Sequence, residues 1–112
     1  MIKSTYIHIP FCKQKCKYCS FTSYTQTGLE KTYLNVLFDE IKHFYDKSFQ
    51  NTIYIGGGTP SLLDFKDFEK ILSLFNFNKN SEVTVEINPE SSYKDFIKNL
   101  KKIGVNRISI GV

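Results

Sequence analysis

The sequence predicts an α/β fold in which parallel strands alternate with helices. Three observations lead to this prediction. Apolar residues recur in turn at every second position and at helical spacing, and these two kinds of segment alternate along the chain. Clusters of glycine, proline or cysteine follow the first three strand-like segments. With 112 residues, 41% of them hydrophobic and 15% aromatic, the chain has the length of one ordinary domain and enough apolar side chains for a core.

The first strand and the first helix are predicted in the N-terminal third of the chain. Residues 5–9 alternate as a strand. Thr27 and Glu30 have the spacing of a capping box, which predicts a helix of about four turns behind them. His43 has no obvious partner in this helix and is interpreted as a structural or surface residue. The apolar stripe of the helix consists of Leu29, Tyr33, Val36, Leu37, Ile41 and Phe44.

A second strand and helix follow in the middle of the chain. Residues 52–55 read as a strand, and the sequence Gly-Gly-Gly-Thr-Pro at 56–60 predicts that it ends abruptly. Asp64 then has the character of a helix N-cap. The inner face of this second helix is predicted to carry Phe65, Phe68, Ile71, Leu72 and Phe75.

The C-terminal third repeats the pattern. Residues 82–87 alternate as a third strand that stops before Pro89, because proline removes a backbone donor. A third helix is expected from about residue 92, with Gly104 at its end as a left-handed cap, and residues 107–112 begin a fourth strand. The prediction is therefore βαβαβαβ. The buried stripe of the third helix is predicted as Tyr93, Phe96, Ile97, Leu100 and Ile103.

Three cysteines carry the chemistry of this sequence. Cys12, Cys16 and Cys19 are its only cysteines, and they form a CxxxCxxC pattern directly after the first strand. Three thiolates can hold three irons of a [4Fe-4S] cluster and leave the fourth iron open to a ligand. A disulfide framework is disfavoured, since the cysteines are odd in number and close together. A Cys₃His zinc site that includes His8 is the rival interpretation, although structural zinc ligands usually come as two separated pairs.

The segment from Tyr6 to Phe21 resembles the radical S-adenosylmethionine (SAM) superfamily. More narrowly, it resembles the group that contains oxygen-independent coproporphyrinogen III oxidase and a related haem chaperone. The resemblance implies a partial (β/α) TIM-like barrel. Because a complete barrel takes roughly 200 residues or more, residues 1–112 are expected to be the truncated N-terminal half of a radical SAM core domain, with the remainder of the barrel and a C-terminal domain absent. Further SAM ligands and the haem motif of the chaperone are expected beyond Val112.

The unusual residues lie where the predicted strands end, which is the face that binds ligands in parallel α/β folds. Glycines there allow the backbone to approach a ligand closely. Without the resemblance, each of these features would also fit a purely structural interpretation. The glycines could form a turn without a ligand, the glutamate could be solvated, and the aromatic residues could serve only in packing. The resemblance implies contacts with SAM for Tyr6, Tyr18, Gly57, Gly58, Thr59 and Glu86.

The resemblance implies radical SAM chemistry, in which an electron from the cluster cleaves SAM to methionine and a 5′-deoxyadenosyl radical. In the oxidase branch a fourth cysteine typically follows the third by two residues, and here Phe21 occupies that position. The chaperone branch, which binds haem and hands it to an acceptor, is therefore favoured. The alternative is oxidative decarboxylation of the propionates of coproporphyrinogen III to vinyl groups. A zinc-stabilised interaction module without redox activity is the second alternative.

The charge of the chain is concentrated around the cysteines. Residues 1–29 carry four lysines and no acidic residue, and the remaining residues balance, which accounts for the net charge of +4. These lysines would offset the negative charge of a cluster or dock an acidic electron donor such as a flavodoxin or ferredoxin, unless they are simply solvated. Four lysines are too few to predict binding to nucleic acid. The lysines are Lys3, Lys13, Lys15 and Lys17.

The sequence also bears on compartment. No apolar run approaches the roughly 18 residues that span a bilayer, so no membrane span is predicted. Cysteine ligands without disulfide partners fit a reducing compartment, and we therefore expect a cytoplasmic protein. Delivery of haem would still allow a peripheral contact with a membrane.

Overall fold

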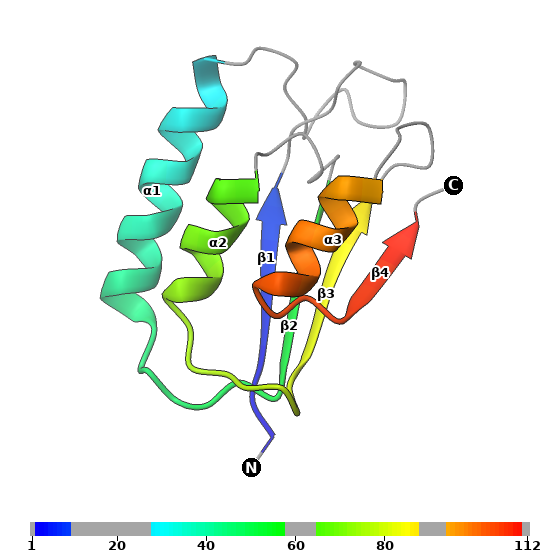
Figure 1. The fold of residues 1–112 in the computed structure, drawn as a ribbon. Helices are drawn as coiled ribbons and strands as arrows, with labels where there is room; N and C mark the ends of the chain where they lie inside the picture. Colours follow the sequence, from blue (N-terminus) through cyan, green and yellow to red (C-terminus); the bar gives the residue numbers. More distant parts are fainter. Residues whose placement is uncertain (1, 10–27, 58–64, 88–93, 111–112) are drawn as a thin grey trace.

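The computed structural model describes residues 2–9, 28–57, 65–87 and 94–110, and its described elements alternate as the sequence predicts (Figure 1). The strands form one parallel sheet in the order β1-β2-β3-β4. The predicted α/β class and βαβαβαβ order are thus confirmed. The elements are β1 (Ser4–Ile9), α1 (Gly28–Phe44), β2 (Thr52–Gly57), α2 (Phe65–Ser73), β3 (Glu82–Ile87), α3 (Lys94–Lys102) and β4 (Arg107–Ile110).

All three helices cover the same face of the sheet, and they lie side by side with α1 outermost (Figure 1). Each helix connects two neighbouring parallel strands, which is the repeating unit of a (β/α) barrel. The carboxyl ends of the four strands consequently lie at one edge of the sheet (Figure 1). The face opposite the helices carries no described element.

The core lies between the sheet and the helices. Because successive strand residues point to opposite faces, every second residue of β1, β2 and β3 enters this core. Leu34, Phe68 and Leu100 contribute from the three helices. The core residues of the strands are Ile7, Ile9, Ile53, Ile55, Val83, Val85 and Ile87.

Helix α1 confirms only part of the predicted stripe, because Ile41 is buried and Tyr33 and Leu37 pack against the core. Its buried residues are Leu34, Phe38 and Ile41, whereas Val36 is 60% exposed and Phe44 is 82% exposed. The helix lies at one end of its layer (Figure 1), so only one side of it meets the sheet. Val36 and Phe44 lie elsewhere on its surface and are exposed. In α3, Ile97 is likewise 38% exposed although it belonged to the predicted stripe. The side chain of Leu29 and residue Tyr93 fall outside the described part.

Several element ends differ by a few residues from the sequence prediction. Strand β2 continues to Gly57, two residues beyond the predicted end, because it pairs with β1 as far as that residue. Helix α2 ends at Ser73, so Phe75 follows the helix, where it still packs against the core.

The predicted cap at Gly104 is confirmed by its φ of 111°. A β-carbon at Gly104 would lie 2.7 Å from the Phe77 ring, so both backbone and packing require glycine there. None of the described helices is long and apolar enough to cross a membrane.

Candidate functional site

The described part of the chain includes three of the predicted site residues, namely Tyr6 in β1, Gly57 at the end of β2 and Glu86 in β3. The predicted metal ligands and the remaining predicted SAM contacts lie outside the described residues. These are Cys12, Cys16, Cys19, Tyr18, Gly58 and Thr59.

The strand register brings the described candidates together on the face opposite the helices. Since Ile7, Ile55 and Val85 point into the core, their neighbours along each strand point the other way. Tyr6 lies opposite Tyr54 in the pairing of β1 with β2. Two residues further along these strands, His8 lies opposite Gly56, and Glu86 lies opposite Ser109 in the pairing of β3 with β4. These residues form a polar and aromatic row close to the carboxyl ends of the strands.

The Glu86 side chain crosses over β2 at Gly56. Its Oε1 accepts a hydrogen bond of 2.9 Å from the backbone N–H of Gly57. A β-carbon on Gly56 would lie 2.3 Å from this Oε1 and 2.7 Å from Cε1 of Tyr54. Only glycine leaves room for the carboxylate at this point. Gly56 is the first glycine of the triple-glycine motif, but the resemblance did not imply a contact with SAM for it.

Gly57 allows the end of β2 to approach β1 closely. Its φ is 123°, a backbone conformation that other residues rarely adopt. A β-carbon there would lie 2.6 Å from the carbonyl oxygen of Ile9 and 2.9 Å from Nδ1 of His8. The backbone N–H of Gly57 therefore lies beside the end of β1, and Gly57 has no side chain that could shield it. Strand β1 ends three residues before the first cysteine.

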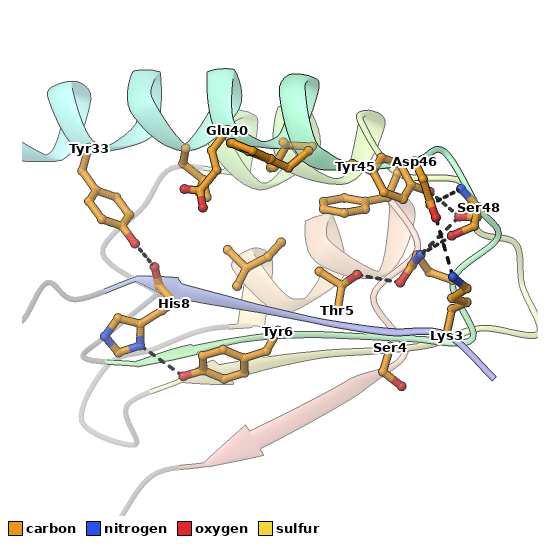
Figure 2. A pocket seen from close by; sticks show the side chains of 16 residues that line it. Lys3, Ser4, Thr5, Tyr6, His8, Tyr33, Glu40, Tyr45, Asp46 and Ser48 are labelled. Carbon is orange, nitrogen blue, oxygen red and sulfur yellow. Dashed lines mark hydrogen bonds and ion pairs between the residues drawn. The ribbon is translucent and has the colours of Figure 1, made fainter. Parts of the chain in front are cut away.

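Two stacked aromatic rings lie on the same face of the sheet as the carboxylate. Tyr6 is 58% exposed, and its ring stacks on Tyr54 with centroids 5.7 Å apart and planes at 18°. Its hydroxyl lies 3.2 Å from Nδ1 of His8 (Figure 2). Burial, the Glu86 charge and Tyr54 together raise the pKa of Tyr6, so its hydroxyl stays protonated at neutral pH. Tyr6 can therefore offer both a ring face and a hydrogen-bond donor.

Helix α1 is tied to the end of β1 by Tyr33. Its hydroxyl donates a hydrogen bond to the carbonyl oxygen of His8 (Figure 2). Burial raises the pKa of Tyr33, followed by the charge of Glu40. From the sequence, Tyr33 was predicted only as part of an apolar stripe, because helical spacing does not indicate which group its hydroxyl will bind. The hydrogen bond fixes the backbone from which the cysteine-bearing segment continues.

A separate groove of about 500 Å³ lies between α1 and the edge of β1 (Figure 2). At its far end Lys3 forms an ion pair of 3.6 Å with Asp46. Hydrogen bonds from Ser48 lower the pKa of Asp46, with a smaller contribution from Lys3. The lining includes Tyr33, Leu37, Glu40, Phe44, Tyr45 and Phe75.

No group of three or more histidine, cysteine or acidic side chains that could hold a metal ion occurs within residues 2–9, 28–57, 65–87 and 94–110. The predicted CxxxCxxC ligands lie outside these ranges. His8, the fourth ligand in the zinc interpretation, is described, and its Nδ1 is engaged with the Tyr6 hydroxyl.

Comparison with known proteins identifies the family. The model of the radical SAM superfamily matches residues 6–112. The chain belongs to the radical SAM superfamily. Among curated radical SAM relatives, the haem chaperone HemW of Buchnera aphidicola (strain Sg) is 41% identical over 97% of this chain, and HemW of Bacillus subtilis is 41% identical over 99%. HemW of Escherichia coli is 38% identical over 97%. The chain spans 31–32% of the length of these relatives.

A solved radical SAM structure has the same fold. Coproporphyrinogen III oxidase (HemN) from Escherichia coli, described as a radical SAM enzyme, matches with a TM-score of 0.86 and 31% sequence identity. The match covers 99% of this chain and 28% of the solved chain. The predicted partial (β/α) barrel and the predicted group of oxidases and haem chaperones are both confirmed.

Radical SAM proteins in general use a [4Fe-4S] cluster and SAM, and the residues of this chain fit both groups. Thiolates in a CxxxCxxC pattern are suitable iron ligands. At the carboxyl end of β2, a β-carbon would fill the space at Gly56 and Gly57, which leaves a backbone cradle beside a carboxylate. Glu86 can accept hydrogen bonds from an ammonium or hydroxyl group there. The donor set and the shape of the cradle therefore agree with the family.

Proposed function

We propose that this chain binds a [4Fe-4S] cluster through Cys12, Cys16 and Cys19 and binds SAM at the carboxyl end of its sheet. The observation that carries the proposal is the Glu86 carboxylate, which the N–H of Gly57 holds at 2.9 Å over a residue without a side chain. Strand β1 ends at Ile9, which pairs with Gly57, and the cysteines follow Ile9 in the sequence. An anionic acceptor, backbone groups and aromatic rings therefore lie close together at the carboxyl ends of the strands.

Each residue has a separate role in this proposal. Glu86 accepts hydrogen bonds from the amino or ribose hydroxyl groups of SAM, and the backbone at 57–59 receives its methionyl part. Tyr6 and Tyr18 lay their rings against the ligand and exclude water. When bound and reduced, the cluster supplies the electron that cleaves the sulfonium bond of SAM. The protein's contribution is to hold SAM in one orientation at the open iron.

Within the superfamily we propose a HemW-like haem chaperone that takes part in porphyrin and haem metabolism. The support is the similarity to curated haem chaperones, at 34–41% identity, against 31% for the solved oxidase. Phe21, where the oxidase branch typically has a cysteine, favours the same branch. In this proposal the chain is the N-terminal part of a cytoplasmic radical SAM core, haem is its cargo, and an acidic flavodoxin or ferredoxin docks on the lysines near the cysteines.

Anaerobic reconstitution with iron and sulfide tests the cluster. The protein is expected to hold about four irons and to turn brown, and Cys12→Ser, Cys16→Ser and Cys19→Ser are each expected to lose the cluster. Because the chain has no other cysteine, no alternative thiolate can replace a missing ligand. Stoichiometric zinc without a cluster would support the Cys₃His module with His8 and contradict the proposal.

A second experiment separates the two branches of the family. Haem is titrated into the complete protein, including the segment expected beyond Val112, and is followed by the shift of its Soret band. Coproporphyrinogen III is offered to the same protein with SAM and a reductant. A chaperone is expected to shift the Soret band and to form no vinyl product. Vinyl groups formed from the propionates would assign the oxidase function instead, and residues 1–112 alone are expected not to produce them.

A further inference from the structure

The three cysteines lie in sequence between two described elements. Strand β1 ends at Ile9 and helix α1 begins at Gly28, and every cysteine of the chain falls between these two residues. The end of β1 and the start of α1 are therefore the two points from which the cysteine-bearing segment is held. A bond that joins these two points reduces the number of conformations open to the chain between them.

One hydrogen bond joins the two elements directly. The Tyr33 hydroxyl of α1 donates to the carbonyl oxygen of His8 in β1, and the bond spans 25 positions of the sequence (Figure 2). His8 is the last residue but one of β1, and Tyr33 lies in the second turn of α1. The bond is thus made close to both ends of the cysteine-bearing segment.

This bond crosses the groove of about 500 Å³ between α1 and the edge of β1. Tyr33 and His8 both line the groove, and they meet at its end nearer the cysteines (Figure 2). The ion pair of Lys3 with Asp46 lies at the opposite end. The Tyr33 hydroxyl therefore supplies a direct link between helix and strand at the end of the groove where the cysteine-bearing segment begins.

The ring of Tyr33 and its hydroxyl have different partners. The ring is partly buried and packs against the core, as does the neighbouring side chain of Leu34. The hydroxyl alone reaches the carbonyl oxygen of His8. Phenylalanine at this position would retain the packing and remove only the link to β1, so the two contributions can be separated by a single oxygen atom.

We propose that Tyr33 is a positioning residue for the [4Fe-4S] cluster, because its hydroxyl fixes the end of β1 relative to the start of α1 and so holds both ends of the segment that carries the iron ligands. This inference rests on the proposed function, since it needs the three cysteines to bind the cluster. A thiolate that leaves its iron returns more readily when the ends of its segment are fixed, because fewer conformations have to be searched. Without the link, iron is expected to leave the protein faster.

The test is the rate at which a chelator removes iron from the complete protein, including the segment expected beyond Val112, after anaerobic reconstitution. Tyr33→Phe is expected to release iron about two- to tenfold faster than the wild type, which is the range that loss of one hydrogen bond allows. Urea denaturation of the same proteins measures their overall stability. Release at the wild-type rate in Tyr33→Phe would overturn the inference.

Tyr45→Phe is the matched control. The Tyr45 hydroxyl also donates to a backbone carbonyl oxygen, that of Ser48, and it accepts a hydrogen bond of 2.9 Å from the N–H of Asn76. Tyr45 follows the last residue of α1, at the other end of the helix from Tyr33. The control is therefore expected to lose at least as much stability as Tyr33→Phe and to release iron at the wild-type rate. Equally fast release from both variants would show an effect of overall stability and would contradict a positioning role.

The experiment distinguishes failure of the inference from failure of the proposed function. If the wild type holds a cluster and Tyr33→Phe retains its iron equally long, the proposed cluster stands and the role of Tyr33 is wrong. If the wild type holds no cluster after reconstitution, the proposed function is wrong, and the inference fails with it.

Discussion

Replacing Gly56 by alanine tests whether the space over β2 is needed for the Glu86 carboxylate. The new β-carbon would lie 2.3 Å from Oε1 of Glu86 and 2.7 Å from Cε1 of Tyr54. Both atoms belong to side chains that can move, so the sheet is expected to remain intact. The side chains must then leave their present positions, and the 2.9 Å hydrogen bond from Gly57 is lost.

The size of the effect follows from two opposing contributions. Loss of a hydrogen bond to a charged carboxylate costs about 1.5–3 kcal/mol. Alanine in a strand is favoured over glycine by roughly 0.5–1 kcal/mol, because it restricts the unfolded chain. The net loss in the free energy of unfolding is therefore about 0.5–2.5 kcal/mol. Because the carboxylate is displaced in every folded molecule, SAM affinity is expected to fall by about tenfold or more.

Urea denaturation measures the first quantity, and equilibrium dialysis of SAM with the reconstituted protein measures the second. Gly104→Ala is the matched control. Its β-carbon would meet Phe77 at 2.7 Å in a backbone of positive φ, so it destabilises the protein at the opposite end of the sheet without reaching Glu86. It is expected to lower stability and to leave SAM affinity unchanged. Wild-type SAM affinity in Gly56→Ala would refute the reasoning.

Three further substitutions give distinct outcomes. Gly57→Ala places a β-carbon 2.6 Å from the backbone carbonyl oxygen of Ile9 at a φ of 123°. Because backbone atoms cannot move aside as a side chain can, this substitution is expected to lower the free energy of unfolding by about 2–4 kcal/mol in urea denaturation. A loss no larger than that of Gly56→Ala would contradict this expectation. Leu100→Ala removes a fully buried side chain and is expected to cost about 2–5 kcal/mol in the same assay, whereas a loss below about 1 kcal/mol would mean that α3 does not pack as described. Ser48 holds the pKa of Asp46 below the usual 3.8, so the stabilisation by ionised Asp46 is present above that value and is lost as the pH falls through the lower folded pKa. Asp46→Asn should therefore flatten the dependence of stability on pH below about pH 4 and leave its course above that pH unaltered, and an unchanged acid limb would argue against the hydrogen bonds to Ser48.

The order and type of the elements could be predicted from the sequence because they depend on local patterns. Alternation in residues 82–87 and helical spacing before Gly104 are both visible within a single segment. Element ends were less accurate, since β2 extends to Gly57 only through its pairing with β1. The buried face of α1 was predicted only in part, since Ile41 is buried as expected whereas Val36 and Phe44 are exposed.

Only those residues of the candidate site that belong to recognisable sequence motifs could be predicted. The resemblance named Glu86 and Gly57, and the structure places the two in contact. It did not indicate Gly56, Tyr54 or Tyr33. Their contacts depend on strand register and side-chain direction between residues about 30 positions apart, and the Gly57 to Glu86 bond itself spans 29 residues. A single sequence contains no local signal for contacts between residues so far apart.

The central claim is that an open iron of a cluster on Cys12, Cys16 and Cys19 binds SAM in this chain. Electron paramagnetic resonance of the anaerobically reconstituted and reduced protein, recorded with and without SAM, tests it most directly. The account predicts the signal of a reduced [4Fe-4S] cluster that changes when SAM is added, because SAM coordinates the open iron. A protein that holds zinc and no cluster, or a cluster whose signal is indifferent to SAM, would contradict the account.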